Sequence, residues 1–159
     1  EGVHDLCGNH WEMVRGLRIK NGKLQATMNN DAALDIDLTL EGDGWKPICD
    51  SNGESITVSV SDENISISTA KNFEQDYTGC EWGDVEIACE SEQLKELALY
   101  AGEPDAYCYI DSTDGEYFPI RGGGWSSGAR AGGFCTHLGN PRSRVYTSVG
   151  FRSAFYGEL

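Results

Sequence analysis

The sequence has no apolar run that approaches the roughly 18 residues needed to cross a membrane as a helix. Its first residues, Glu1 to Asp5, also lack the basic and apolar regions of a secretory signal peptide. These absences predict a soluble chain with no visible export signal. The 159 residues are enough for a single domain, residues 1–159, with its own hydrophobic core, and no internal repeat divides them.

Cysteine pairs with Cys-x-x-Cys spacing are also missing, which leaves zinc-ribbon and thioredoxin-like sites unsupported. The six cysteines are Cys7, Cys49, Cys80, Cys89, Cys108 and Cys135. An even number permits disulfides in an oxidising compartment, whereas the absence of an export signal favours buried free thiols. Both alternatives stay open on the sequence alone.

Acidic residues are nearly absent from one end of the chain. The formal net charge is −14, but residues 121–159 contain five arginines and a single acid, Glu158. The acidic body argues against nucleic acid or an anionic membrane as a partner, because phosphate binding needs a concentrated positive field. The arginine-bearing end remains suited to an anionic sugar or an acidic protein patch.

Alternating apolar and polar residues predict mostly strands. The strongest signal is Asn21-Gly22 between the alternating segments 17–20 and 23–26, which is typical of a tight hairpin. Further strands are expected at 34–40, 56–60, 65–68, 106–110 and 117–120. A single helix is expected from Ser91, its N-cap, to Tyr100, since Gly102 and Pro104 follow. In the segment 5–14, Trp11 and Met13 are expected to point inward.

The segment 121–156 is rich in glycine, serine, arginine and aromatic residues, a composition typical of recognition loops. Trp125, Val149 and Phe151 are expected in the core, and Arg121 is expected to hydrogen-bond loop carbonyls. The remaining side chains are predicted to form one exposed ligand-binding patch. They are Ser126, Ser127, Arg130, Phe134, Thr136, His137, Arg144, Tyr146 and Ser148. The alternative is a solvated loop before an ordinary last strand.

Motifs at both ends of the chain carry a family resemblance. Arg121-Gly122-Gly123-Gly124-Trp125, Gly150-Phe151-Arg152 and Gly8-Asn9-His10-Trp11-Glu12 resemble the C-type-lectin fold of the formylglycine-generating, sulfatase-modifying-factor family. The segment 2–9 with Gly16-Leu17-Arg18 resembles a non-catalytic branch of it, the phage and bacterial variable proteins diversified by retroelements.

This resemblance implies an α+β, C-type-lectin-like fold. Residues 1–25 and 106–159 would form the core motif, and residues 26–105 an acidic, mostly β insertion. The family's motif lies well inside its fold, so the N-terminal part of the domain is expected to be missing.

The resemblance also implies a function: a receptor-binding domain with a variable C-terminal loop surface, as in a phage tail-tip or cell-surface adhesin. Its partner would be a host-surface protein or glycan, its place the virion tail or the cell surface, and it could form a homo-oligomer within a larger assembly. The alternatives are a sulfatase-modifying-factor-like enzyme or its inactive relative, and a structural virion decoration domain.

Catalysis is not expected, because the oxidase of this family binds copper through two cysteines about five residues apart, and soft thiolates suit that metal. Residues 121–159 contain Cys135 alone. Cys135 and His137 could in principle act as a nucleophile and its general base, but no third residue that would orient the base is evident.

Two metal sites are conceivable near the N-terminus. His4, Cys7, His10 and Glu12 have spacings that suit zinc, but burial of Trp11 and Met13 would turn His10 and Glu12 to the opposite face. The resemblance instead implies calcium, bound by the side chains of Asp5 and Glu12 and the main-chain oxygens of Gly8 and His10. Oxygen ligands suit that ion. A helix-cap or buried hydrogen-bonding role for Asp5 and Glu12 is the alternative.

Overall fold

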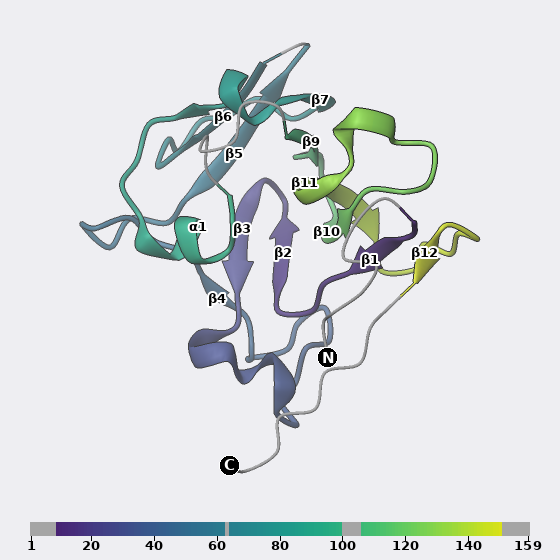
Figure 1. Ribbon diagram of the computed structural model, residues 1–159. Coiled ribbons are helices and arrows are strands. Elements are labelled where there is room, and N and C mark those ends of the chain that lie inside the picture. Colours follow the sequence, from purple (N-terminus) through teal and green to yellow (C-terminus); the bar gives the residue numbers. More distant parts are fainter. Residues whose placement is uncertain (1–8, 63, 100–105, 151–159) are drawn as a thin grey trace.

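The computed structural model describes residues 9–62, 64–99 and 106–150, which form one continuous curled sheet (Figure 1). The strands are β1 (Trp11–Met13), β2 (Leu17–Lys20), β3 (Lys23–Ala26), β4 (Lys46–Pro47), β5 (Thr57–Ser61), β6 (Asn64–Ser68), β7 (Tyr77–Glu81), β8 (Glu86–Ile87), β9 (Tyr107–Asp111), β10 (Glu116–Gly122), β11 (Gly132–Pro141) and β12 (Val149–Gly150). The helical segments are η1 (Met28–Ala33), η2 (Trp82–Asp84), α1 (Glu92–Glu96) and η3 (Gly128–Arg130).

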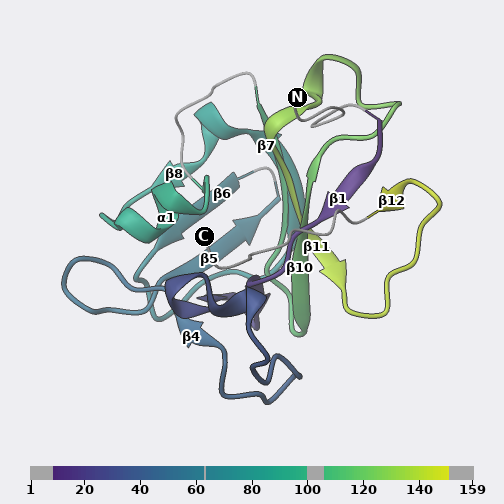
Figure 2. The same cartoon turned by 60° about the horizontal axis from the view of Figure 1, so that its bottom comes forward.

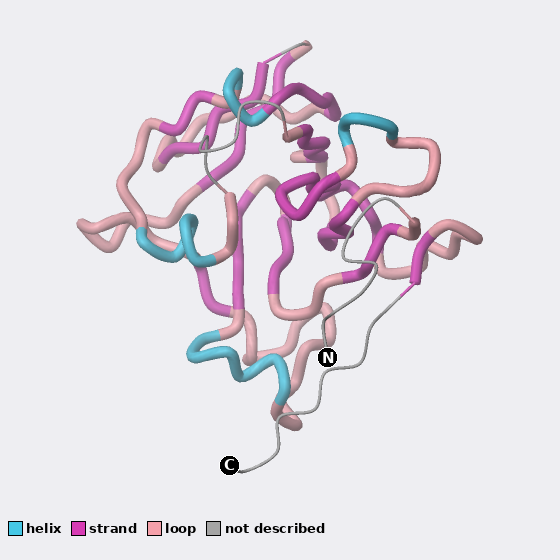
Figure 3. Tube along the Cα trace, in the orientation of Figure 1, coloured by secondary structure: helices cyan, strands magenta, loops and turns pink. Residues whose placement is uncertain are grey.

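The prediction of an α+β, C-type-lectin-like fold is wrong. The structure is mostly β, with 42% strand and 12% helix, and its sheet curls into a half-barrel. Figure 3 shows that the helical segments are short and lie around the sheet. The only α-helix among the described residues is α1, which spans five residues. A helix of that length is too short to cover a sheet. The sheet instead curls so that its apolar face is enclosed on the inside.

The strand order is β7-β9-β11-β10-β2-β3-β5-β6-β8. β1 pairs with β10 and, in parallel, with β12, while β4 pairs with β3. The segment 26–105 therefore supplies strands β4 to β8 to the same sheet as the two ends of the chain. Although β7 lies at one end of this order, it also contacts β5 and β6 near the other end. The Val60 amide of β5 donates to the carbonyl oxygen of Glu74, which precedes β7. Figure 2 shows the curl from a second direction.

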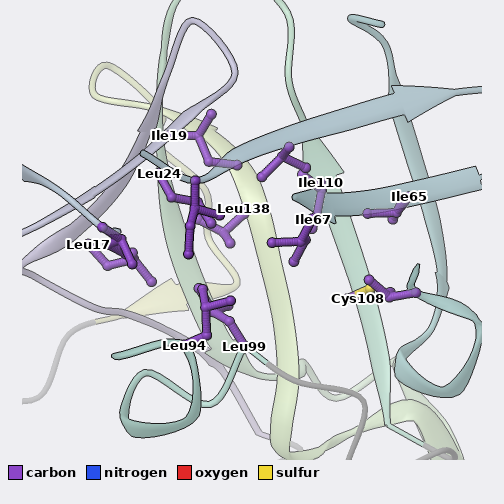
Figure 4. Packing of buried hydrophobic residues seen from close by; sticks show 14 of the residues in the cluster. Leu17, Ile19, Leu24, Ile65, Ile67, Leu94, Leu99, Cys108, Ile110 and Leu138 are labelled. Atoms are coloured by element: carbon purple, nitrogen blue, oxygen red, sulfur yellow. The ribbon is translucent and has the colours of Figure 1, made fainter. Parts of the chain in front are cut away.

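The hydrophobic core fills the inside of this curl (Figure 4). It contains the inward side chains of strands from both halves of the chain. Members that are at most 2% exposed include Leu17, Ile19, Leu24, Val58, Val60, Ile65, Ile67, Trp82, Leu94, Leu99, Cys108, Ile110 and Leu138. Every second residue of β5, β6 and β9 belongs to this set. The alternation in the sequence therefore arises because successive side chains of a strand point to opposite faces of the sheet.

The predicted hairpin around Asn21-Gly22 is confirmed. β2 pairs with β3, and Asn21 and Gly22 between them have φ angles of 49° and 72°, the positive values that this tight turn requires. β5 and β6 also form an antiparallel pair, with Asp62 at φ 35° in the turn. Arg121 hydrogen-bonds a loop carbonyl, that of Leu97, as predicted.

The strand predicted at 34–40 is wrong. These residues follow η1 and form a loop in which the side chains of Leu34 and Leu40 are 57% and 48% exposed. The Asp37 carboxylate accepts a hydrogen bond from the Thr39 amide, and the Asp37 carbonyl accepts one from Gly44. Local hydrogen bonds of this kind compete with strand pairing. The alternation of apolar and polar residues was therefore not enough to make this segment a strand.

The predicted helix at 91–100 is shorter than expected. α1 ends at Glu96, and Ala98 has a positive φ of 52°. The Ser91 hydroxyl does not cap the helix but donates to the carbonyl oxygen of Cys49. Tyr100 lies outside the described residues.

None of the helices in the described part of the chain has the length and apolar composition required to cross a membrane.

Candidate functional site

Aromatic side chains gather on the outer surface of β7, β9 and β11. In β9, Cys108 and Ile110 point into the core, so Tyr107 and Tyr109 point outward. Tyr109 lies opposite Gly79 of β7 and beside His137 of β11. We call the set formed by Trp11, Tyr77, Tyr107, Tyr109 and His137 the aromatic face.

The rings of the aromatic face contact one another. The centroid of Tyr109 lies 4.8 Å from that of Tyr107 and 5.1 Å from that of His137. His137 is also 5.9 Å from Tyr77 and 6.0 Å, edge to face, from Trp11. These separations lie within or close to the range at which aromatic pairs attract. The rings thus hold one another in place and present a continuous surface.

Two glycines allow the rings to lie against the backbone. A Cβ at Gly79 would lie 2.3 Å from Cδ1 of Tyr109, and one at Gly139 would lie 3.0 Å from Nε2 of His137 and 3.2 Å from a ring carbon of Tyr77. The Tyr107 hydroxyl donates to the carbonyl oxygen of Gly79 at 2.9 Å. Gly79 therefore supports two of the tyrosines at once.

This arrangement makes Gly79→Ala informative. The added methyl group would displace the Tyr109 ring, and overpacking of this kind costs about 1–3 kcal/mol of unfolding free energy. The matched control is Gly133→Ala, because a Cβ at Gly133 meets nothing within 4 Å. Urea unfolding of both variants measures the difference. Equal stability of the two would show that Tyr109 can move freely.

His137 is neutral in the folded protein. Burial and the nearby charge of Arg144 lower its pKa to about 4, while Asp111 acts weakly in the opposite direction. Its Nε2 lies 3.4 Å from the Tyr77 hydroxyl. An uncharged imidazole at neutral pH acts in this face as a polar ring and not as a cation.

A hollow of about 210 Å³ lies at the edge of the aromatic face. It is lined by Trp11, Tyr109, Ser126, Ser127, Arg130 and Cys135. The loop between β10 and β11, residues 123–131, contains η3, and we call it the η3 loop. It supplies Arg130, whose guanidinium carbon lies 4.3 Å from the ring centroid of Tyr107, a cation–π contact. Ser127 accepts a hydrogen bond from the Gly124 amide, so its hydroxyl hydrogen remains able to donate.

A second loop, residues 142–148, joins β11 to β12 (yellow-green to yellow in Figure 1). It carries Arg144, stacked on the ring of Tyr146 at 4.1 Å, and Val145, which is 90% exposed. Tyr146 is itself 41% exposed. This loop and the η3 loop lie on the same side of the molecule as β9 and β11 (Figure 1).

The nine residues predicted to form one patch lie on the aromatic face, on the two loops beside it, or in less exposed positions of β11. Ser126, Ser127 and Arg130 line the hollow, His137 belongs to the aromatic face, and Arg144 and Tyr146 lie on the second loop.

Three others differ from the prediction. Thr136 is completely buried, and its hydroxyl donates to the Phe134 carbonyl, so it cannot contact a ligand. Phe134 is half-buried, and its carbonyl also accepts a bond from the Trp82 indole. Ser148 is half-buried, and its carbonyl accepts from the Trp11 amide.

Several core assignments change as well. Trp125, expected inside, is 76% exposed in the η3 loop, and Met13 is 40% exposed. Trp11 is half-buried against the aromatic face. Phe151 lies outside the described residues.

Sequence reasoning missed Tyr77, Tyr107 and Tyr109. The alternation Tyr107, Tyr109, Asp111 against Cys108 and Ile110 was the available signal. It predicts which side chains of this strand point outward, but it does not show that β7 and β11 are its neighbours.

The metal predictions gain no support from the described residues. Among residues 9–62, 64–99 and 106–150, no three histidine, cysteine or acidic side chains are placed to hold a metal ion. Of the predicted calcium ligands, His10 is exposed and Glu12 is half-buried, while Asp5 and Gly8 lie outside the described residues, as do His4 and Cys7 of the zinc set. Because half of the calcium set lies outside the described residues, the calcium site stays a prediction.

The five described cysteines, all except Cys7, carry free thiols. Cys80 and Cys108 face each other across β7 and β9 with their sulfur atoms 3.9 Å apart. Burial raises the pKa of Cys135 to about 11, so its thiol is protonated at neutral pH. A protonated thiol is a poor nucleophile and a poor metal ligand.

Comparison with known proteins yields no relatives: no protein-family model matches the sequence, and no curated protein matches it.

Proposed function

We propose that this protein is a recognition domain that binds a partner through the aromatic face and the two loops beside it. The observation that carries the proposal is the pairing of exposed arginines with tyrosines at this face. Arg130 stacks on Tyr107 and Arg144 on Tyr146, and within the described residues neither forms an ion pair. Arginine and tyrosine are the residues in which binding energy concentrates at interfaces.

Exposed apolar groups on the two loops support the same surface. Trp125 is 76% exposed and Val145 is 90% exposed, so each loop offers an apolar side chain to a partner. The loops contain Gly123, Gly128 and serines, which supply turns and adaptable hydrogen bonds. Residues 121–159, from which both loops come, contain five arginines and a single acid, whereas the whole chain has a net charge of −14.

In this proposal the partner is a receptor on a cell surface, either a protein or a glycan. The protein itself would belong to a phage tail tip or to a cell surface, as the resemblance to the retroelement-diversified variable proteins implies. The arginine-bearing loops fall in residues 121–150, the segment in which such proteins vary. An enzymatic role has less support, because the Cys135 thiol is protonated and the partner of His137 is the Tyr77 hydroxyl rather than a carboxylate that would orient a base.

A binding experiment tests the proposal. Fluorescently labelled protein is applied to a panel of bacterial strains and binding is measured by flow cytometry. Tyr109→Ala and Arg130→Ala are each expected to weaken binding to the recognised strain by about 2 kcal/mol, which is roughly 30-fold. Arg130 is exposed, so its substitution should change stability by less than about 0.5 kcal/mol.

The control is Lys95→Ala, which also removes one positive charge but lies on α1, at an exposed ion pair with Glu92. It should bind as the unmodified protein does. Unchanged binding of both Tyr109→Ala and Arg130→Ala would place the interaction on another surface. Failure to bind any strain would contradict a receptor on the cell surface.

The neighbourhood of the gene offers an independent test. A reverse-transcriptase gene and a near-copy of the codons for residues 121–152 would support a diversified receptor-binding protein. A neighbouring sulfatase gene would favour the enzyme.

A further inference from the structure

The hollow beside Tyr109 differs from the rest of the binding surface in being concave and small. Its volume of about 210 Å³ lies below the roughly 300–1,000 Å³ of pockets that enclose drug-sized ligands. It therefore suits one small ring of a ligand rather than a folded segment of another protein. What that ring must carry follows from the groups that line the hollow.

The charge of the lining is of one sign. Arg130 is the only charged residue among the six that line the hollow. Its guanidinium carbon lies 4.3 Å from the Tyr107 ring centroid, and it forms no ion pair with a described residue, so its N–H groups can bind an acceptor. Glu81 lies opposite Tyr107 on β7, but it does not line the hollow. A carboxylate is the acceptor that best matches such an arginine.

The remaining lining divides into aromatic and hydroxyl groups. Trp11 and Tyr109 offer aromatic surface, whose negative ring faces attract the weakly positive C–H groups of a saturated ring. Ser126 and Ser127 offer hydroxyls, and the Ser127 hydroxyl hydrogen is free to donate because its oxygen accepts from Gly124. A ligand that satisfies all three kinds of group needs a carboxylate, a C–H face and hydroxyls on one ring.

We propose that the hollow binds a sugar acid, a pyranose ring that bears a carboxylate, as the terminal unit of a receptor glycan. Arg130 binds the carboxylate, Tyr109 and Trp11 contact the C–H face of the ring, and Ser126 and Ser127 hydrogen-bond its hydroxyls. This inference rests on the proposed function and specifies the ligand of that surface. The acidic body repels such a ligand only weakly at physiological salt, since the screening length is about 8 Å.

The test compares two sugars that differ only in the carboxylate, methyl β-glucuronide and methyl β-glucoside, by NMR titration of the ¹⁵N-labelled protein. The glucuronide should shift the amide resonances of Ser126, Ser127 and Arg130 and bind at least about tenfold more tightly than the glucoside. Arg130→Gln should reduce glucuronide binding to the glucoside level. Tyr109→Ala should weaken both sugars, and Lys95→Gln should change neither.

Equal binding of the two sugars, glucuronide binding that survives Arg130→Gln, or no binding of either sugar would each overturn the inference. An acidic peptide that binds with dependence on Arg130 while the sugars do not would show that the partner is a protein. If the sugars fail but Tyr109→Ala still abolishes cell binding, the ligand class is wrong and the recognition surface stands. If cell binding is also insensitive to Tyr109→Ala, the proposed function itself is wrong.

Discussion

Substitution of Glu116 by alanine is expected to lower the free energy of unfolding by about 3–5 kcal/mol. The reason is Arg18, which is only 2% exposed on β2. Its Nη1 donates to the Glu116 carboxylate at 2.5 Å, and the two side chains are 3% and 7% exposed. Loss of Glu116 leaves a buried positive charge without its counterion, and the desolvation of that charge is then uncompensated.

The other contacts of Arg18 cannot replace this carboxylate. Its Nε donates to the side-chain oxygen of Gln25 at 2.7 Å, its Nη1 donates to the Leu40 carbonyl, and its guanidinium lies over the Trp45 ring. All of these partners are uncharged. They orient the guanidinium and attach the loop 34–45 to the sheet, but they do not neutralise it.

Urea unfolding measures the effect, and two variants make it specific. Arg142→Ala removes the other cation that contacts Glu116, but the Arg142 side chain is 50% exposed, so a loss of at most about 1 kcal/mol is expected. The double variant Arg18→Leu with Glu116→Leu removes both buried charges and should be more stable than Glu116→Ala alone. A loss below about 1 kcal/mol for Glu116→Ala would contradict the buried-pair interpretation.

The second large effect is expected from pH, through His137. Its pKa is about 4 in the folded protein and ordinarily 6.5, so between these values the unfolded chain binds the proton and the folded protein does not. Stability therefore falls as the pH drops through this window. One pKa unit corresponds to 1.36 kcal/mol, so the loss between pH 7 and pH 4.5 should be about 2–3 kcal/mol.

The variant His137→Phe keeps a ring in the aromatic face but cannot titrate. Its unfolding free energy should change less than that of the unmodified protein between pH 7 and pH 4.5, and the difference isolates His137 from the carboxyl groups. Identical pH dependence of the two proteins would mean that the imidazole is hydrated in the folded state.

Glu116 acts in a different pH range. Burial alone would raise its pKa, but the hydrogen bonds and charges of Arg142 and Arg18 outweigh burial and hold the pKa below its usual value. Its contribution to stability is therefore present above the usual carboxyl pKa and is lost as the pH falls through the lowered one. The His137 effect should appear first on acidification.

The sequence predicted local structure better than long-range structure. The Asn21-Gly22 hairpin depends on turn residues and alternation within about a dozen residues, and it was predicted correctly, as were the two strands that form β5 and β6. Residues 34–40 were mistaken for a strand because the alternating Leu34, Ile36, Leu38 and Leu40 satisfy the same pattern. Their conformation is set by Arg18 and Lys20, whose side chains both donate to the Leu40 carbonyl from β2.

The candidate site was predicted in part for the same reason. Ser126, Ser127, Arg130 and Arg144, which the proposed surface includes, could be selected from the sequence because loop composition is visible in one segment. The aromatic face was missed because β11 pairs in parallel with β9, while β10, which precedes β11 in the chain, lies on its other side. No periodicity within a single strand contains that information. Trp125 is exposed and Thr136 is buried, the reverse of the prediction, because hydrophobicity alone does not show that Thr136 lies in a central strand and Trp125 in a loop.

The pairing of β1 with β10 and β12 has a consequence for how the chain folds. Trp11 and Glu12 find their partners at Arg121, Val149 and Gly150, so β1 is joined to strands from the far end of the sequence. During synthesis, β2, β3, β5 and β6 can pair as soon as they leave the ribosome. β1 can pair completely only after β12, residues 149–150, has also been synthesised. Contacts of such sequence separation form slowly, because a long loop must close before they contribute. Trp11 is therefore expected to join the aromatic face among the last steps of folding, after the core has formed.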